Sequence, residues 1–267
     1  MGDPWETVQQ IVGRIDRGTI SSQTSPESSG YKCEKCRDTG WIEFTDENGN
    51  RFANKCSCRL AREAEERMRA SGLADSIRQQ TFDAFKVNNA VQKQIKDTAK
   101  RYLDDLLTSW GKPRMPWLYI GGNPGSGKTH ICTAVCGELL RHNIGVKYMQ
   151  WLSEVRKLKS CAFDENFEDE VGEYVGPPVL YIDDLLKQKY TDDPVFTEAD
   201  IKVAFTILNA RYLLNRPTII SSEWDLTEQL LNADEGVFSR VYERCRGYAI
   251  NIRRSRENDY RLMGGVE

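Results

Sequence analysis

The sequence has little net charge, no long apolar run and no start typical of a secretory signal, and each of these features excludes a class of protein. Its 37 basic and 40 acidic residues nearly balance, which excludes a uniformly basic nucleic-acid coat protein. No apolar stretch approaches the roughly 18 residues that a membrane-spanning helix needs. The first residues also lack the basic start and apolar stretch of a secretory signal. We therefore expect a soluble protein that works in the cytoplasm.

Helix and strand patterns alternate from about residue 81 onward. Short apolar or β-branched runs predict strands at residues 117–120, 146–149, 179–182, 218–220 and 248–252. Apolar residues at helical spacing predict helices between them, at residues 91–107, 131–140 and 199–214. Strands that alternate with helices form a parallel sheet covered on both faces, so the sequence predicts an α/β fold.

A glycine-rich motif stands between the first of these strands and the helix that follows it. Residues 122–129 fit the pattern G-x-x-x-x-G-K-[ST] of a phosphate-binding loop. Its glycines let main-chain N–H groups surround anionic oxygens, and the helix N-terminus adds positive charge. Lys128 is expected to meet the β- and γ-phosphates, and Thr129 to bind magnesium. The expected ATP-binding residues are Gly122, Asn123, Pro124, Gly125, Ser126, Gly127, Lys128 and Thr129.

A pair of acidic residues ends the predicted strand at 179–182. Asp183 would lie at the carboxyl edge of the sheet beside the phosphate loop, where it can hold magnesium. Asp184 is the predicted residue that polarises the attacking water. These residue types predict an ATPase that uses ATP and Mg²⁺.

The order of the motifs resembles that of AAA+ ATPases of the DnaC/DnaI type, the bacterial and phage helicase loaders. The segments that carry the resemblance are residues 81–85, 121–129, 182–185, 211–222 and 239–244. The resemblance implies an AAA+ ATPase domain over residues 76–267. It also implies that Arg240 is an arginine finger, with Arg244 as the alternate, whereas the simpler interpretation of Arg240 is a surface pair with Glu243.

The resemblance places the nucleotide-sensing element of this family at residues 221–223. Glu223 stands where the family usually has asparagine, and an ionised carboxylate cannot donate a hydrogen bond, so Ser222 is the expected substitute. The chain beyond this element is too short for a full helical lid. We therefore expect weak ATPase activity in the isolated monomer, with self-association in the ATP state.

Four of the eight cysteines cluster in a separate region at residues 31–75, which follows an N-terminal segment and flexible linker at 1–30. The C-x-x-C and C-x-C pairs flank a predicted hairpin, which suits one tetrahedral zinc ion. Neither histidine lies nearby, so the expected ligands are Cys33, Cys36, Cys56 and Cys58. Redox thiols and unliganded core cysteines are the alternatives. Residues 31–78 hold ten basic and nine acidic side chains, which favours protein binding over DNA binding.

Three basic residues, Arg156, Lys157 and Lys159, lie on a predicted helix where initiator and loader ATPases line a groove for single-stranded DNA. A solvated helix face explains them equally well. The resemblance to helicase loaders implies an ATP-dependent loader that binds a replicative hexameric helicase and single-stranded DNA and delivers the helicase during replication initiation. The alternatives are an IstB-like transposition ATPase that acts on duplex DNA and a nucleotide-gated adaptor without significant hydrolysis.

Overall fold

The structure is a computed structural model whose chain divides into two units, Met1–Leu60 and Ala61–Glu267. It describes residues 31, 33–45, 49–56, 58, 59, 66, 69, 71–160, 167–187 and 196–260. The predicted segment and linker at 1–30 lie outside the described residues. The division at Leu60 falls earlier in the chain than the one expected at residue 75. Leu73 and Ile77, at helix α3 (Ala74–Gln79), lie in the core of the second unit.

The first unit contains the expected hairpin. Strands β1 (Trp41–Thr45) and β2 (Arg51–Lys55) pair antiparallel, with Phe44 opposite Phe52 and their ring centroids 5.5 Å apart. All five residues of β1 are exposed. The N–H group of Cys56 donates to the carbonyl of Gly40 at 2.9 Å, so the hairpin returns the second cysteine pair to the first.

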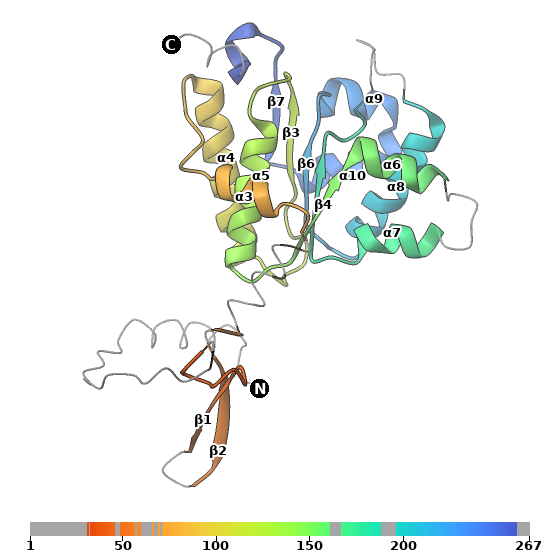
Figure 1. Cartoon of the computed structure of the whole chain (residues 1–267). Coiled ribbons are helices and arrows are strands. Elements are labelled where there is room, and N and C mark those ends of the chain that lie inside the picture. Colours follow the sequence, from red (N-terminus) through yellow and green to blue (C-terminus); the bar gives the residue numbers. More distant parts are fainter. Residues whose placement is uncertain are drawn as a thin grey trace. The chain divides into compact units, whose positions relative to one another are not determined.

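The second unit is built on five parallel strands in the order β4-β5-β6-β3-β7 (Figure 1), which confirms the predicted α/β fold. The strands are β3 (Leu118–Gly122), β4 (Val146–Gln150), β5 (Val179–Asp183), β6 (Thr218–Ser221) and β7 (Ala249–Ile252). The carboxyl ends of parallel strands meet at one edge of a sheet, so the residues after β3, β5 and β6 come together there. All residues of β3, β5 and β6 are buried, as their apolar sequences predict.

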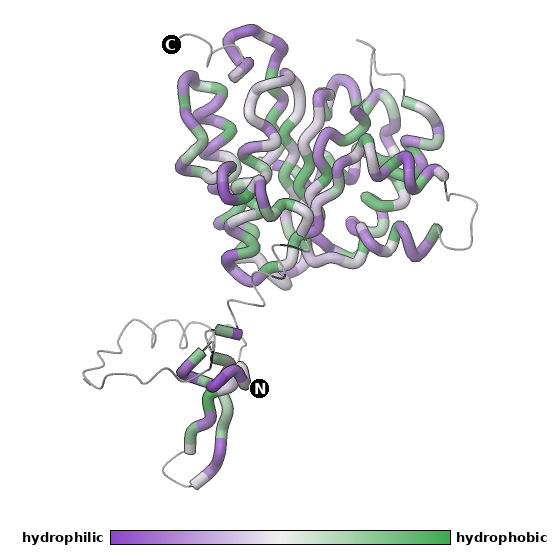
Figure 2. Tube along the Cα trace, viewed as in Figure 1, coloured by the Kyte–Doolittle hydropathy of each residue, from purple (hydrophilic) through white to green (hydrophobic). Residues whose placement is uncertain are grey.

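Helices cover both faces of this sheet (Figure 1). Helices α3, α4 (Ala90–Thr108) and α5 (Lys128–Arg141) share one hydrophobic core with one face of the sheet. The second core lies on the other face, and the elements that contribute to it are α6 (Trp151–Ser160), α7 (Phe167–Val175), α8 (Glu198–Leu213), η1 (Leu226–Leu230) and α10 (Glu235–Arg244). Figure 2 shows hydrophobic residues along the strands and on the inward sides of the helices.

The remaining described elements are short. Helix α9 (Leu231–Ala233) joins η1 to α10, and the turn η2 (Arg256–Asn258) follows β7. Asp225 caps η1, since its side chain accepts from the N–H groups of Thr227 and Glu228. Within the described part of the chain, no helix has both the length and the apolar character to cross a membrane.

Arg211 of α8 is fully buried and holds the segment before β5 in place. Its guanidinium donates to the carbonyls of Tyr174, Val175 and Pro177 at 3.0–3.1 Å and to the hydroxyl of Thr218 at 2.9 Å. Burial lowers the pKa of Arg211 to about 9. Arg211, the first residue of the segment 211–222 that carries part of the family resemblance, therefore has a structural role in the second unit.

Candidate nucleotide site

The phosphate loop lies between β3 and α5, at the carboxyl edge of the sheet. It borders a cavity of about 300 Å³ that is also lined by residues after β5 and β6, among them Asp184, Lys187 and Glu223. Gly122 and Gly127 have φ angles of +100° and +85°, which favour glycine. A Cβ at Gly122 would collide with the carbonyl oxygen of Ile252, and one at Gly127 would lie 2.8 Å from the Phe85 ring. The loop therefore needs glycine at both positions.

Lys128 is 6% exposed and turns toward its own loop. Its ammonium donates to the carbonyls of Gly122 and Asn123, each at 2.8 Å. Burial lowers the pKa of Lys128, while the carboxylates of Asp184 and Glu223 act in the opposite direction. The charge predicted to meet the phosphates therefore lies at the loop.

The predicted magnesium ligands Thr129 and Asp183 lie next to each other. The Thr129 hydroxyl donates to Asp183 Oδ1 at 3.0 Å, across 54 residues of sequence. A hydroxyl beside a carboxylate is the donor set that Mg²⁺ takes in phosphate-loop ATPases, so the two residues fit the ion.

Three further hydroxyl groups hold the Asp183 carboxylate. Tyr181 and Ser221 donate to Oδ1, the former at 2.7 Å, and Tyr148 donates to Oδ2 at 3.0 Å. Sequence patterns do not indicate this role for any of the three, although Ser221 belongs to the expected nucleotide-sensing element. Tyr181 could have been found, because residues two apart on a strand share a face, whereas Tyr148 and Ser221 come from the neighbouring strands.

Asp184, the predicted water-polarising residue, has a φ angle of +57° and forms an ion pair with Lys187, whose Nζ lies 2.8 Å from Asp184 Oδ2. The same Nζ lies 2.9 Å from Glu223 Oε1. Burial raises the pKa of the Asp184 carboxyl, and the hydrogen bond from Lys187 opposes this effect. The Lys187 ammonium therefore links Asp184, the predicted water-polarising residue, to Glu223 of the nucleotide-sensing element.

Ser222 does not line this cavity. The side chain is fully buried, and its hydroxyl donates to the Leu185 carbonyl at 2.9 Å and accepts the Trp224 N–H at 3.1 Å. The substitute role expected for Ser222 thus has no geometric support, because the hydroxyl is engaged with the loop after β5. Glu223 is the residue of this element that lines the cavity.

An aromatic group closes another side of the cavity. The ring centroid of Phe85 lies 5.3 Å from that of His130 and 5.5 Å from that of Tyr260, with edge-to-face geometry. The N–H group of Tyr260 donates to the carbonyl of Gly125 at 2.8 Å, so the residues after β7 reach the phosphate loop. Aromatic side chains suit the flat face of a nucleobase. Sequence patterns gave no sign of Tyr260, which reaches the site only through the fold.

The two arginines considered for the finger differ in their surroundings. Arg240 is half-buried on α10, donates to the Gly236 carbonyl, and lies 5.9 Å from the ring centroids of Phe205 and Tyr212. The structure shows no pair between Arg240 and Glu243 in the described part of the chain, and Glu243 accepts from the Tyr212 hydroxyl at 2.8 Å.

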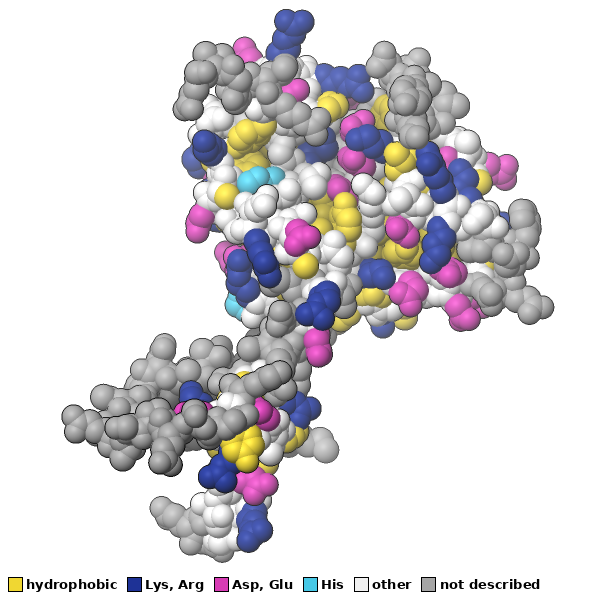
Figure 3. All heavy atoms as spheres, in the orientation of Figure 1, with side chains coloured by type: hydrophobic (Ala, Val, Ile, Leu, Met, Phe, Trp, Pro, Cys, Tyr) yellow, Lys and Arg dark blue, Asp and Glu magenta, His cyan; other side chains and the backbone are white. Residues whose placement is uncertain are grey.

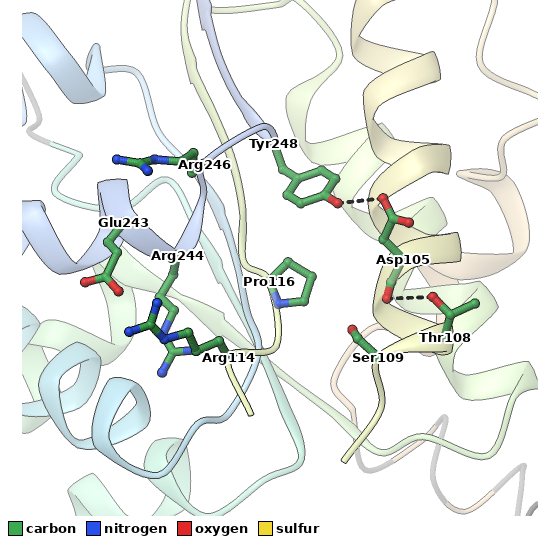
Figure 4. A pocket seen from close by; sticks show the side chains of 9 residues that line it. All are labelled: Asp105, Thr108, Ser109, Arg114, Pro116, Glu243, Arg244, Arg246 and Tyr248. Atoms are coloured by element: carbon green, nitrogen blue, oxygen red, sulfur yellow. Dashed lines mark hydrogen bonds between the residues drawn. The ribbon is translucent and has the colours of Figure 1, made fainter. Parts of the chain in front are cut away.

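Arg244 is held by its own subunit. It donates to Asn215 Oδ1 at 2.9 Å and to the Tyr212 carbonyl at 3.0 Å. Its side chain lies beside that of Arg114 at a cavity of about 680 Å³. Tyr248 and Asp105, which are hydrogen-bonded to each other, line the other side of this cavity (Figure 4). These contacts favour Arg240 over Arg244 as the finger, and its role in an assembly stays a prediction.

The basic residues predicted to contact DNA lie on α6, and two of them pair with acids. Lys157 lies 2.5 Å from Glu170 of α7, and Lys159 lies 2.6 Å from Asp200 of α8. Arg156 is exposed and has no ion pair with any residue that the structure describes. Basic and acidic side chains are interspersed on this side of the second unit (Figure 3). DNA binding by these residues stays a prediction.

The four predicted zinc ligands lie together in the first unit. Their Sγ atoms are all within 4.8 Å of one another, with 3.8 Å between Cys33 and Cys56 and 3.4 Å between Cys36 and Cys58. Sulfur ligands at about 2.3 Å from a tetrahedral zinc stand roughly 3.8 Å apart, so these thiols fit the ion and are not disulfides. The N–H group of Gly40 also donates to Cys36 Sγ at 3.3 Å.

Comparison with known proteins yields one family and several relatives. Residues 39–258 match the family described as IstB-like ATP binding protein. The phage-like element PBSX protein XkdC of Bacillus subtilis (strain 168) is 30% identical over 266 residues, which cover 97% of this chain and 98% of XkdC. The replicative helicase loader DnaI of the same strain is 26% identical over 167 residues, 59% of this chain and 52% of that protein. A crystal structure of DnaI shares the fold, with a TM-score of 0.52 and 22% identity over 68% of this chain and 94% of that one.

Proposed function

The chain belongs to the IstB-like ATP-binding protein family and is an ATPase with an AAA+ fold, and from this premise we propose that it loads a replicative helicase. In this proposal it binds a hexameric DNA helicase and single-stranded DNA in the cytoplasm and delivers the helicase during replication initiation. The observation that carries the proposal is the presence in one chain of a four-cysteine unit and a phosphate-loop ATPase unit. The similarity to the loader DnaI supports it.

The geometry of the nucleotide site accounts for the chemistry of ATP hydrolysis. Lys128 and the loop N–H groups would bind the phosphates, and Thr129 and Asp183 would hold Mg²⁺, which would supply positive charge to stabilise the phosphates. Hydrolysis forms a bond between the water oxygen and the γ-phosphorus and breaks the bond to the oxygen that leaves with ADP. Asp184 takes the proton that the water releases.

The cysteine unit is the proposed contact to the helicase. We expect the zinc-loaded full chain to co-purify with a hexameric replicative helicase, and the variant Cys36→Ser to lose this binding while it still binds ATP. Size-exclusion chromatography of the mixtures, with mass spectrometry of the co-eluting protein, measures both. Cys136→Ala, in α5, is the matched control and should keep helicase binding. Unchanged helicase binding by Cys36→Ser would indicate that the helicase contacts the second unit instead.

The family match supports one alternative, a transposition ATPase that acts on duplex DNA. The two functions differ in the nucleic acid that raises ATP turnover. Turnover raised by single-stranded DNA favours the loader, whereas turnover raised by duplex DNA alone favours the transposition ATPase. Binding of ATP without turnover under both conditions would indicate a nucleotide-gated adaptor.

Arg240 should act only between subunits. Because Arg240 lies on α10 and is not among the residues that line the nucleotide cavity, we expect Arg240→Ala to leave ATP affinity within twofold but to reduce turnover of the assembled protein by about 10³-fold, the low end of the range for an arginine finger. ATP turnover at low and high protein concentration measures this effect. Arg246→Ala, a change at a nearby exposed arginine, is the control. Equal turnover of Arg240→Ala and the wild-type assembly would show that Arg240 is not an arginine finger.

A further inference from the structure

A second ammonium group faces the nucleotide cavity, and the roles assigned above leave it unused. Lys187 forms ion pairs with Asp184 and Glu223 at 2.8 and 2.9 Å. It lines the same cavity as Lys128 and Thr129. Its side chain keeps 34% of its surface exposed, so it is accessible from the cavity.

The backbone around Lys187 is clamped by the end of β6. Leu185 donates its N–H to the Ser221 carbonyl at 2.9 Å, and the indole of Trp224 donates to the Leu186 carbonyl at 2.9 Å. Asp184 and Leu186 have φ angles of +57° and +58°, in the left-handed region that non-glycine residues rarely adopt. Hydrogen bonds to the end of β6 and from the residues that follow it thus maintain a turn that returns Lys187 to the cavity.

The hydrogen-bonding capacity of Lys187 is only partly used. An ammonium has three N–H donors, and Asp184 and Glu223 each accept from one of them. Burial would lower the pKa of Lys187, but the hydrogen bonds to Asp184 and Glu223 outweigh it and raise the pKa, so the side chain is charged at neutral pH. No third acceptor for Lys187 is found among the residues that the structure describes, so one donor of a charged group remains for an anion in the cavity.

The charges in the cavity indicate which anion this is. Lys128 and Lys187 are close enough that the charge of Lys187 helps to lower the pKa of Lys128, after the larger effect of burial. Lys128 follows the loop glycines, whereas Lys187 lies beside the carboxylate predicted to polarise the attacking water. An anion between the two ammonium groups would thus be the phosphate that water attacks.

We propose that Lys187 recognises the terminal phosphate of ATP through its remaining N–H donor and that Glu223 is the positioning residue that holds Lys187 there. This inference rests on the proposed ATP site and is independent of the helicase. A lysine and a carboxylate then perform the sensing that the family assigns to an amide. ADP lacks the phosphate that Lys187 contacts, so the contact distinguishes ATP from ADP.

The test compares the affinities of two nucleotides. We expect Lys187→Met to weaken binding of a non-hydrolysable ATP analogue about tenfold, equivalent to about 1.4 kcal/mol, and to change ADP binding less than twofold. Isothermal titration calorimetry of the full chain with Mg²⁺ measures both, and the thermal midpoint reports whether the variant folds. Lys93→Met is the matched control, since Lys93 also pairs with a carboxylate, at 2.6 Å, but on the surface of α4.

A double variant separates direct contact with the phosphate from neutralisation of the Glu223 carboxylate. If Lys187 contacts the phosphate, Lys187→Met combined with Glu223→Gln should still bind the analogue about tenfold more weakly than Glu223→Gln alone. If Lys187 only neutralises Glu223, the second change should restore wild-type affinity, which would overturn the inference. An equal loss for ADP and the analogue would also overturn it. Wild-type protein that binds neither nucleotide would instead refute the ATP site itself.

Discussion

Lys128→Ala should abolish ATP binding, with an affinity loss of at least about 100-fold, or about 2.8 kcal/mol. Lys128 is the one residue of the phosphate loop whose side chain brings a full positive charge to the phosphates, and it is 6% exposed, so its charge is poorly screened by water. No other basic group lies inside the loop itself. Calorimetric titration of ATP into the full chain measures the loss.

Lys128 also stabilises the loop, which requires controls. Its ammonium donates to the carbonyls of Gly122 and Asn123, so alanine could loosen the loop as well as remove charge. Thr129→Ala keeps Lys128 and these two hydrogen bonds but removes the predicted magnesium ligand. It should bind ATP nearly normally without Mg²⁺ and lose the gain in affinity that Mg²⁺ provides. ATP affinity of Lys128→Ala close to the wild-type value, with an unchanged thermal midpoint, would contradict the site.

Removal of zinc should unfold the first unit and leave the second intact. In the described residues of the first unit, the buried hydrophobic side chains are Cys36 and Cys56, and every residue of β1 is exposed. Such a unit has little apolar surface to bury, so the roughly 10–16 kcal/mol available from a structural zinc site would dominate its stability. Hydrogen exchange of residues 41–55, before and after a chelator, should show protection that disappears with the metal.

The same experiment distinguishes zinc from the other roles of cysteine. Metal analysis should find one zinc per chain in the wild type and in Cys136→Ala, and none in Cys56→Ser. ATP binding should survive in all three, because the nucleotide site lies wholly in the second unit. Protection of residues 41–55 that persists without metal would show that the thiols are not structural zinc ligands.

Local patterns in the sequence determined the elements and most of the central residues of the site. Strands β3, β5 and β6 are buried apolar or β-branched runs, β4 and β7 are short and partly buried, and the helices carry apolar residues at helical spacing, so the five strands could be predicted from neighbours in the chain. The phosphate loop and the acidic pair after β5 could be identified in the same way. Both lie at the ends of strands, and the carboxyl ends of parallel strands share an edge, so the contact between Thr129 and Asp183 followed from topology alone.

Tertiary structure alone decided which side chains surround these residues. The hydroxyl of Tyr148 meets Asp183, Glu223 rather than Ser222 lines the cavity, and Tyr260 reaches the phosphate loop. Each of these contacts joins segments that become neighbours only through the strand order β4-β5-β6-β3-β7 or through the path of the chain after β7. The physical reason is that hydrophobic periodicity depends on residues a few positions apart. The order in which strands pair depends on how whole helices and strands pack, so a polar contact between distant segments leaves no local pattern in the sequence.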